Sequence, residues 1–488
     1  MNRLYGSAFV RCTLTLRLSR AGWNHGPRLC HTAAKGTRTA TSVCLRLALA
    51  GTGVVVLGLF GRHRKSECER NVKSDEVGAP GIVVAVSIDG KSVWSEENTA
   101  HEQVLATPDV ENRVKCRPET VMRIASISKV KTMTIVARLM EQGKLDIDKA
   151  VESYVPTWPR KTVNGKPVTV TTRQLLSHLA GVRHYDKSCN KKDMHNDTDA
   201  KNQAGGESKE WKKKENSEKE ENKKKTKNNS KEKDEFEDNE YLIKDHFDSV
   251  TSSLCLFKDD ALCSEPGSKF LYTTHGWTLV SAVVEAAAGQ PFTKLVKELF
   301  NDLGLKSSYL DENDPIIYNR ARYYTRGARS RLLNVPYVDV SYKWAGGGFL
   351  STVLDLTAFG NVMLYSYQYR DTMRDLPPGY LKSSTVETMW TPVKNSVCTW
   401  DTDGAMGLGW GVVPESLSHG CCKHRRFYAS HTGGAVGASS ALVVLPRRKL
   451  DADIPPQGLV VALITNLQGV GMNAVALKIA ELFEDVEM

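Results

Sequence analysis

A densely charged segment, residues 186–240, most constrains how this chain can fold. Of its 55 residues, 31 are charged, fifteen as Lys and sixteen as Asp or Glu, and none is Leu, Ile or Val. Such a stretch cannot bury enough apolar surface to offset the entropy lost on folding. We predict a disordered insertion here, with a long charged helix as the alternative.

The sequence on both sides of this insertion is patterned, so we expect a loop on one domain and not a linker between two. The chain has 488 residues, 41% of them hydrophobic and 25% charged. These values exclude a wholly disordered, collagen-like or polytopic membrane chain. We predict one folded domain over residues 78–488, interrupted by the insertion.

The N-terminal region has the composition of a targeting sequence. Residues 1–66 hold eleven basic residues and no acidic one, whereas the rest of the chain, with 55 basic and 56 acidic residues, has a net charge of −1. Arg scattered among Leu, Ser and Thr is typical of a mitochondrial transit peptide, which we predict over residues 1–68. The body carries no charge excess that would indicate nucleic-acid binding.

An apolar run, residues 47–60, lies near the end of this leader. Its 14 uncharged residues are fewer than the ~20 that a membrane-spanning helix needs, and an extension back to residue 41 admits Arg46 near the helix end. Two alternatives stay open. Residues 41–60 either anchor the chain to the inner membrane, with the body in the intermembrane space, or form a sorting signal that is removed.

The cysteines argue against a metal centre. The chain has eleven, and no two are arranged as C-x-x-C. Structural zinc sites and redox dithiols usually need such paired thiols. We therefore predict neither a metal ion nor an organic cofactor.

Strands are predicted at both ends of the folded domain. An apolar run at 80–88, the turn Asp89-Gly90 and a second β-rich run at 91–95 indicate a hairpin. Near the C-terminus, 437–445 and 458–466 are predicted to be buried strands. Helices are expected at 127–142, 172–180, 277–288 and 472–483, of which the second has a Thr171-x-x-Gln174 capping box and ends at Gly181. This order predicts an α+β fold whose two ends share one antiparallel sheet.

Ser126 and Lys129 are the first candidate catalytic pair. They stand three residues apart at the start of a predicted helix, so Lys129 can reach the Ser126 hydroxyl. A serine needs a nearby base to become a nucleophile, and a helix N-terminus stabilises negative charge that develops beside it. Alone, S-x-x-K matches many helices by chance.

Two further segments follow in order, Tyr-Thr-Thr at 272–274 and His-Thr-Gly-Gly at 431–434. With Ser126 and Lys129 they resemble the serine β-lactamase and penicillin-binding-protein superfamily, whose elements are S-x-x-K, S/Y-x-N and K/H-T-G on a strand edge. The Tyr form resembles the class C branch, and the leader narrows the resemblance to its mitochondrial members in animals. It covers residues 78–185 and 241–488. It implies a β-lactamase/transpeptidase-like fold, an antiparallel sheet with flanking helices and an all-helical subdomain.

The resemblance implies a role for each matching residue. Ser126 would be acylated and Lys129 would activate it. Tyr272 would carry the proton between serine and leaving group, with a phenolic pKa lowered by Lys129 and His431. The remaining implied roles are an oxyanion hole from the backbone N–H groups of Ser126 and Gly434, and a substrate-lining surface of Thr274, Thr432 and Gly433 beside the catalytic His431.

Three features depart from the usual pattern of the branch. Thr274 replaces Asn, and a hydroxyl lacks the paired donor and acceptor of an amide. His431 replaces the Lys of most β-lactamases, and because an unperturbed imidazole titrates near ~6.5, we predict that activity changes between about pH 6 and 8. A polar stretch at 96–108 replaces a short Gly-Tyr segment and is either a genuine surface loop or a gene-model artefact. His178 and His184 belong to no motif, and His178 is predicted to be structural.

The resemblance also implies a function. It indicates a serine hydrolase, which we interpret as a peptidase of the intermembrane space that acts on a peptide or protein substrate through a Ser126 acyl-enzyme and influences mitochondrial lipid metabolism. Because a fold does not determine a function, two alternatives stay open. One is a homo-oligomeric, filament-forming structural protein of the same compartment, and the other is an esterase.

Overall fold

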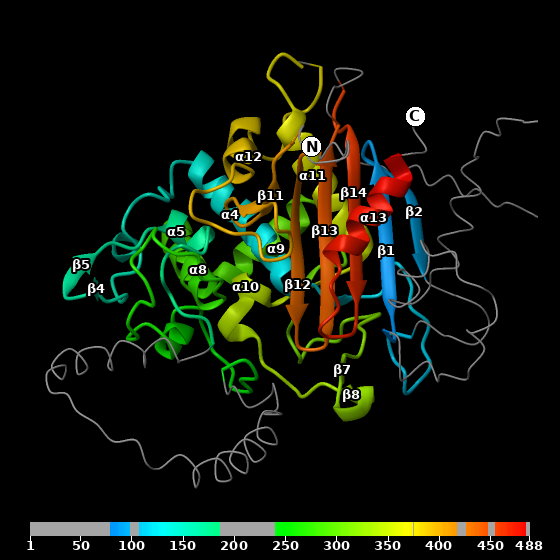
Figure 1. Ribbon diagram of the computed structural model, residues 1–488, viewed down its shortest axis with the longest axis horizontal. Helices are drawn as coiled ribbons and strands as arrows, with labels where there is room; N and C mark the ends of the chain where they lie inside the picture. Colours follow the sequence, from blue (N-terminus) through cyan, green and yellow to red (C-terminus); the bar gives the residue numbers. More distant parts are fainter. Residues whose placement is uncertain are drawn as a thin grey trace, which may run out of the picture. The chain divides into compact units, whose positions relative to one another are not determined.

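An antiparallel sheet forms the centre of the folded domain (Figure 1). The structure is a computed structural model that describes residues 79–97, 107–185, 240–373, 375–416, 426–447 and 454–484. The predicted leader with its apolar run, nearly all of the charged insertion and residues 98–106 lie outside the described residues. Within the described residues the sheet has seven strands, which are, in spatial order, β10 (Ala405–Met406), β11 (Gly411–Val413), β12 (Tyr428–Ala435), β13 (Ala438–Pro446), β14 (Gly458–Thr465), β1 (Ile82–Ile88) and β2 (Lys91–Glu97).

The predicted hairpin and the predicted pairing of the chain's two ends are both confirmed. Asp89 and Gly90 have φ of 48° and 75°, the left-handed values that a tight two-residue turn between antiparallel strands requires. β1 pairs with β2 on one side and with β14 on the other, both antiparallel. The N-terminal and C-terminal parts of the domain therefore complete the same sheet.

Two helices cover the two faces of the sheet. Val460, Ala462 and Ile464 of β14 belong to the large core that includes α11 (Val353–Gln368), whereas Val461 and Leu463 belong to a second core with α13 (Asn473–Glu484). The alternation follows from the two-residue period of a strand. Figure 1 shows α13 lying across one face of β13 and β14.

The remaining elements pack beside the sheet and contain most of the helices. The helices are α4 (Ser128–Glu141), α5 (Thr172–Leu176), α8 (His275–Ala288), α9 (Phe292–Asp302), α10 (Trp344–Gly347) and α12 (Ser383–Met389). The 3-10 turns are η1 (Ala125–Ile127), η2 (Val151–Ser153), η3 (Ser252–Leu256), η4 (Ala328–Ser330) and η5 (Ser341–Lys343). The small sheets are β3 (Met122–Arg123) with β9 (Phe349–Ser351) and β6 (Tyr309–Leu310), β4 (Lys161–Val163) with β5 (Lys166–Val168), and β7 (Tyr324–Arg326) with β8 (Leu332–Asn334). In the part of the chain that the structure covers, no helix combines the length and the apolar character that crossing a membrane would require.

The helix predictions are confirmed except for the C-terminal end of α5. The capping box is present, since Thr171 accepts from Gln174 N while the Gln174 side chain accepts from Thr171 N. The predicted end at Gly181 is wrong, because α5 stops at Leu176 and His178 has a φ of 59°. A contact distant in sequence accounts for this, since His178 Nδ1 accepts a hydrogen bond from Thr273 N in the segment before α8.

Candidate active site

Ser126 lies in η1, the 3-10 turn that leads into α4. The residue before it, Ala125, has a φ of 47°, a left-handed conformation that costs energy for any residue with a Cβ atom. The surrounding structure holds this turn in place, since Ser440 Oγ of β13 donates to Ile124 O at 2.9 Å. A Cβ atom at Gly433 would clash with Ile124 O, so glycine lets β12 approach the nucleophile turn closely.

Lys129 is fully buried on the first turn of α4, beside Ser126. Its Nζ lies 3.0 Å from Ser126 Oγ and donates to Gly346 O of α10 at 2.6 Å. Burial lowers the pKa of Lys129 well below its ordinary value of 10.5, and the charge of Lys343 lowers it further. This lowering favours the free amine, the form that can accept a proton.

Tyr272 brings a phenol to the same serine. Its hydroxyl hydrogen-bonds to Ser126, and Lys129 Nζ lies 5.0 Å from its ring centroid. Burial raises the pKa of Tyr272 above its ordinary value of 10. The predicted lowering of this pKa by neighbouring cations is wrong, because burial has the larger effect and the imidazole of His431 is uncharged.

Two histidines that the sequence analysis did not assign to the site hold the Tyr272 segment. His178 stacks on the Tyr272 ring at 4.3 Å, and its Nδ1 accepts from Thr273 N at 3.1 Å. His184 Nδ1 accepts from Thr274 N at 3.2 Å. His178, which was predicted to be structural, is buried and directly supports the candidate tyrosine. No sequence signal could have shown this, because about 90 residues separate each donor from its acceptor.

The third predicted element lies on β12, next to the nucleophile turn. Thr432 is partly exposed, Gly433 is buried and Gly434 is exposed. β12 pairs with β11 only through Tyr428–Ser430, so within the described residues its edge beyond Ser430 pairs with β13 alone. This leaves residues 431–435 without a second partner strand in the described part of the chain, although Thr432 O accepts from His431 Nδ1.

His431 is fully buried on β12 and its imidazole is neutral. Its Nδ1 donates to Thr432 O at 2.6 Å, and the ring of Trp400 lies 4.7 Å away. Burial, followed by the effect of Lys129, lowers the pKa of His431 to about 3. The prediction that His431 titrates between pH 6 and 8 is therefore wrong, because the sequence does not show that this imidazole lies in the core.

Thr274 is also buried beside the catalytic pair. Its side chain hydrogen-bonds to the phenol of Tyr185, and a Cβ atom at Gly346 would come within 2.7 Å of Thr274 Cγ2. The structure therefore brings Thr274 into the site and engages its hydroxyl within the protein.

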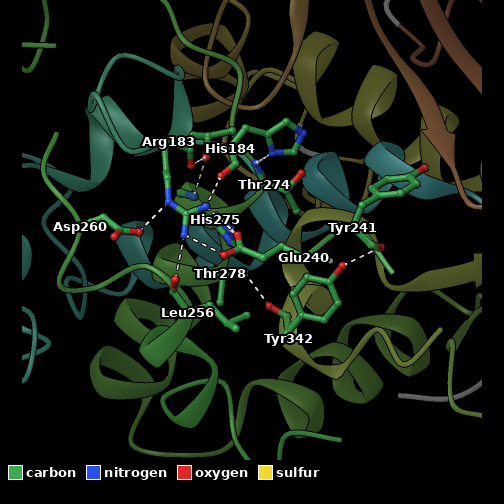
Figure 2. A network of polar contacts seen from close by, with 12 residues as sticks. Arg183, His184, Glu240, Tyr241, Leu256, Asp260, Thr274, His275, Thr278 and Tyr342 are labelled. Atoms are coloured by element: carbon green, nitrogen blue, oxygen red, sulfur yellow. Dashed lines mark hydrogen bonds and ion pairs between the residues drawn. The ribbon is translucent and has the colours of Figure 1, made fainter. Parts of the chain in front are cut away.

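An ion-pair network anchors the segment that carries His184 and Tyr185 (Figure 2). The buried Arg183 pairs with Glu240 and Asp260, both at 2.6 Å. Glu240 also lies 3.0 Å from Nε2 of His275, the first residue of α8. The network thereby joins the chain on both sides of the charged insertion to the helix that follows Tyr272.

A partly exposed serine bonded to a buried lysine and to a tyrosine hydroxyl, at an open edge of an antiparallel sheet, defines a serine hydrolase of the acyl-transfer class. The β-lactamase family model matches residues 69–483, and the chain belongs to the beta-lactamase family. The chain is 49% identical to the mouse protein "Serine beta-lactamase-like protein LACTB, mitochondrial" over 437 residues, which cover 84% of this chain and 78% of the relative. It is equally identical to the human protein of that name, with 84% and 77% covered.

Solved structures show the same fold at low sequence identity. EstCE1, described as a hydrolase with promiscuous acyltransferase activity, superposes with a TM-score of 0.59 at 17% identity, covering 91% of this chain and all of that one. The octameric penicillin-binding protein homologue from Pyrococcus abyssi gives a TM-score of 0.55 at 20% identity, covering 82% of this chain and 74% of that one. The predicted β-lactamase/transpeptidase-like fold is confirmed.

Proposed function

We propose that this protein is a mitochondrial serine peptidase that acts through an acyl-enzyme on Ser126. The observation that carries the proposal is the placement of Ser126 Oγ within 3.0 Å of the buried Lys129 amine and in hydrogen-bond contact with the Tyr272 phenol. A base and an acid on the same hydroxyl are what acyl transfer to a leaving amine requires.

The pKa shifts of Lys129 and Tyr272 indicate a different role for each group. Lys129 takes the proton of Ser126 as Oγ bonds to the substrate carbonyl carbon. As the C–N bond breaks, Tyr272 gives its proton to the departing amine and regains one from the Lys129 ammonium. Water then attacks the ester and gives a proton to Lys129, and Ser126 Oγ recovers its proton through Tyr272. The raised pKa of Tyr272 suits a proton donor, and the lowered pKa of Lys129 suits an acceptor.

The open edge of β12 is the proposed substrate surface. An extended peptide can add to such an edge through backbone hydrogen bonds, with Thr432 and Gly433 alongside it. The N–H groups of Ser126 and Gly434 form the proposed oxyanion hole, each contributing ~3 kcal/mol to the transition state. Thr274 orients the Tyr272 segment on the other side.

The compartment and the wider role are part of the proposal. The transit-peptide composition of residues 1–68 and the relatives, which are named mitochondrial, support a mitochondrial location. Within that organelle we place the domain in the intermembrane space, held by residues 41–60, where its peptidase activity influences lipid metabolism. These points, together with the filament and esterase alternatives, rest on the resemblance and stay predictions.

The test is intact mass of the full chain after exposure to a fluorophosphonate and to a penicillin-type acylating probe. A single adduct is expected on Ser126, absent in Ser126→Ala and strongly reduced in Lys129→Ala. Ser153→Ala, a change of an exposed serine outside the site, is the matched control and should be labelled like the wild type. An adduct that persists in Ser126→Ala, or none on folded wild-type protein, contradicts the proposal and favours the structural polymer.

A further inference from the structure

Arg123 is a buried arginine that stands three residues before Ser126 and that the catalytic scheme does not use. It ends β3 and is 7% exposed. Its Nε lies 2.6 Å from Asp311 Oδ2, and its Cζ lies 4.3 Å from the ring centroid of Tyr323. Its backbone N–H donates to the Tyr323 hydroxyl at 3.0 Å. These contacts hold the guanidinium in one position in the core.

One donor of this guanidinium reaches the turn between β12 and β13. Nη1 of Arg123 donates to Val436 O at 2.9 Å. Val436 and Gly437 are the two residues between the strands. The turn also packs against Tyr323, because a Cβ atom at Gly437 would come within 2.4 Å of Tyr323 Cβ. Arg123 and Tyr323 therefore hold the turn from the same side.

This turn lies close in the chain to one of the two N–H groups of the proposed oxyanion hole. Gly434 stands two residues before Val436, and Ser126 stands three residues after Arg123. The bond from Arg123 to Val436 thus joins the two short stretches of chain that carry these donors. Both N–H groups must point to the same oxygen at about 2.7–3.1 Å, so their separation has to be fixed.

A second contact between the same stretches lies on the other side of Gly434. Ser440 Oγ donates to Ile124 O at 2.9 Å, and a Cβ atom at Gly433 would clash with Ile124 O. This contact sets how closely β12 approaches the nucleophile turn, but one point of contact leaves the strand able to pivot. Gly434 itself is exposed, and a Cβ atom there would meet nothing within 4 Å. The bond from Arg123 supplies the second fixed point, beyond Gly434.

We propose that Arg123 is a positioning residue of this active site, which fixes the separation of the Ser126 and Gly434 N–H groups by holding the turn between β12 and β13. The inference rests on the proposed function, since it concerns the oxyanion hole of the Ser126 acyl-enzyme. A guanidinium is always charged and carries its donors in a rigid plane, so its bond to Asp311 also sets the direction of its bond to Val436. A displacement of about 1 Å at a catalytic group can lower a rate by about 100-fold.

The test measures Ser126 labelling by the fluorophosphonate over a range of probe concentrations, by intact mass of the full chain. This separates the maximal labelling rate from the probe concentration that gives half of it. In Arg123→Met the maximal rate should fall by about 10- to 100-fold and the half-saturating concentration should change by less than about threefold, because an oxyanion hole acts on the transition state and not on probe binding. Arg123→Lys presents one nitrogen in place of three and should label at an intermediate rate.

Arg320→Met is the matched control. Arg320 pairs with the same carboxylate, Asp311, and donates to Glu312 O at 2.6 Å. Among the described residues, none of its hydrogen bonds or ion pairs reaches β12. Each arginine leaves the other as the counter-charge of Asp311, so neither change leaves that carboxylate unpaired. Arg320→Met should lose stability and keep the wild-type maximal rate.

Three results overturn the inference while wild-type labelling persists. They are a wild-type maximal rate in Arg123→Met, an equal fall of that rate in Arg320→Met, and a change in the half-saturating concentration alone. If Arg123→Met does not give folded protein, Arg123→Lys decides, since a wild-type maximal rate there overturns the inference as well. Absence of Ser126 labelling in the wild type contradicts the proposed function instead.

Discussion

The histidine of the third element shows how burial changes the chemistry of a residue that a motif identifies. His431 donates from Nδ1 to the Thr432 carbonyl, so its Nε2 carries the lone pair. The imidazole is enclosed by the core and by Trp400, and among the described residues no carboxylate compensates a second proton. It therefore presents an uncharged acceptor where a lysine would present a cation.

A first prediction concerns pH. Because the pKa of His431 is lowered to about 3, the imidazole is already neutral at pH 6 and gains no charge until far below it. We expect the labelling rate of His431→Gln, which stays neutral, to differ from the wild type by one constant factor across pH 6 to 8. A wild-type transition in that window that disappears in His431→Gln would show that the imidazole titrates there.

A second prediction concerns the contact between β12 and the nucleophile turn. Gly433→Ala places a methyl group against Ile124 O and Ser440 Oγ, so β12 must move away from Ser126. We expect a loss of about 1–3 kcal/mol in the free energy of unfolding and a fall in labelling rate. Gly434→Ala is the matched control, since its Cβ atom meets nothing within 4 Å. Equal denaturant midpoints for the two variants would contradict this packing argument.

At the scale of elements, the Arg183 network holds the segment of His184 and Tyr185 against α8 (Figure 2). Arg183→Met leaves Glu240 and Asp260 without their buried counter-charge, which should cost about 3–5 kcal/mol of stability. Arg173→Met breaks an exposed ion pair with Asp148 and should cost about 0–1 kcal/mol. Chemical denaturation of both variants measures the difference, and similar losses would show that burial does not decide the strength of these pairs.

Local chemistry explains which elements the sequence predicted correctly. The Asp89-Gly90 turn, the Thr171 capping box and the left-handed Gly289 that ends α8 each depend on neighbouring residues alone. The pairing of Ser126 with Lys129 was predictable for the same reason, since one helical turn joins them. These signals lie within a few residues of the structure that they specify.

The rest of the site depends on contacts between distant segments. His178 and His184 reach the Tyr272 segment across about 90 residues, and the ring contact between Tyr185 and Tyr241 joins residues on both sides of the insertion. Charge states also depend on burial, which explains why the expected lowering of the Tyr272 pKa and the expected titration of His431 between pH 6 and 8 were wrong. Without the packed structure, the neutral imidazole of His431 could not have been recognised.

At the scale of the whole molecule, the folded domain is assembled from sequence on both sides of the insertion, and the two sides are tied together where it begins and ends. Arg183 Nη1 lies 2.6 Å from Glu240 Oε2, and the rings of Tyr185 and Tyr241 are 5.5 Å apart. The candidate site residues lie in η1, in α4, in the segment before α8 and in β12. The contacts described above that join these elements involve no residue between 186 and 239. The two sides of the domain are therefore held together by residues that flank the insertion.

The last prediction follows from these contacts beside the insertion. Replacing residues 188–237 by about eight Gly and Ser residues, enough to connect the chain between the contacting Tyr185 and Tyr241, should change the Tm of the full chain by only a few degrees and leave the Ser126 labelling rate unchanged. Loop entropy changes slowly with length, so the shorter connection should alter stability by no more than about 1–2 kcal/mol. The matched control carries the same deletion together with Arg183→Met, which should lose stability as Arg183→Met does alone. A folded deletion variant that no longer labels would show that the insertion contributes to catalysis, contrary to the prediction of a solvated loop on an independent domain.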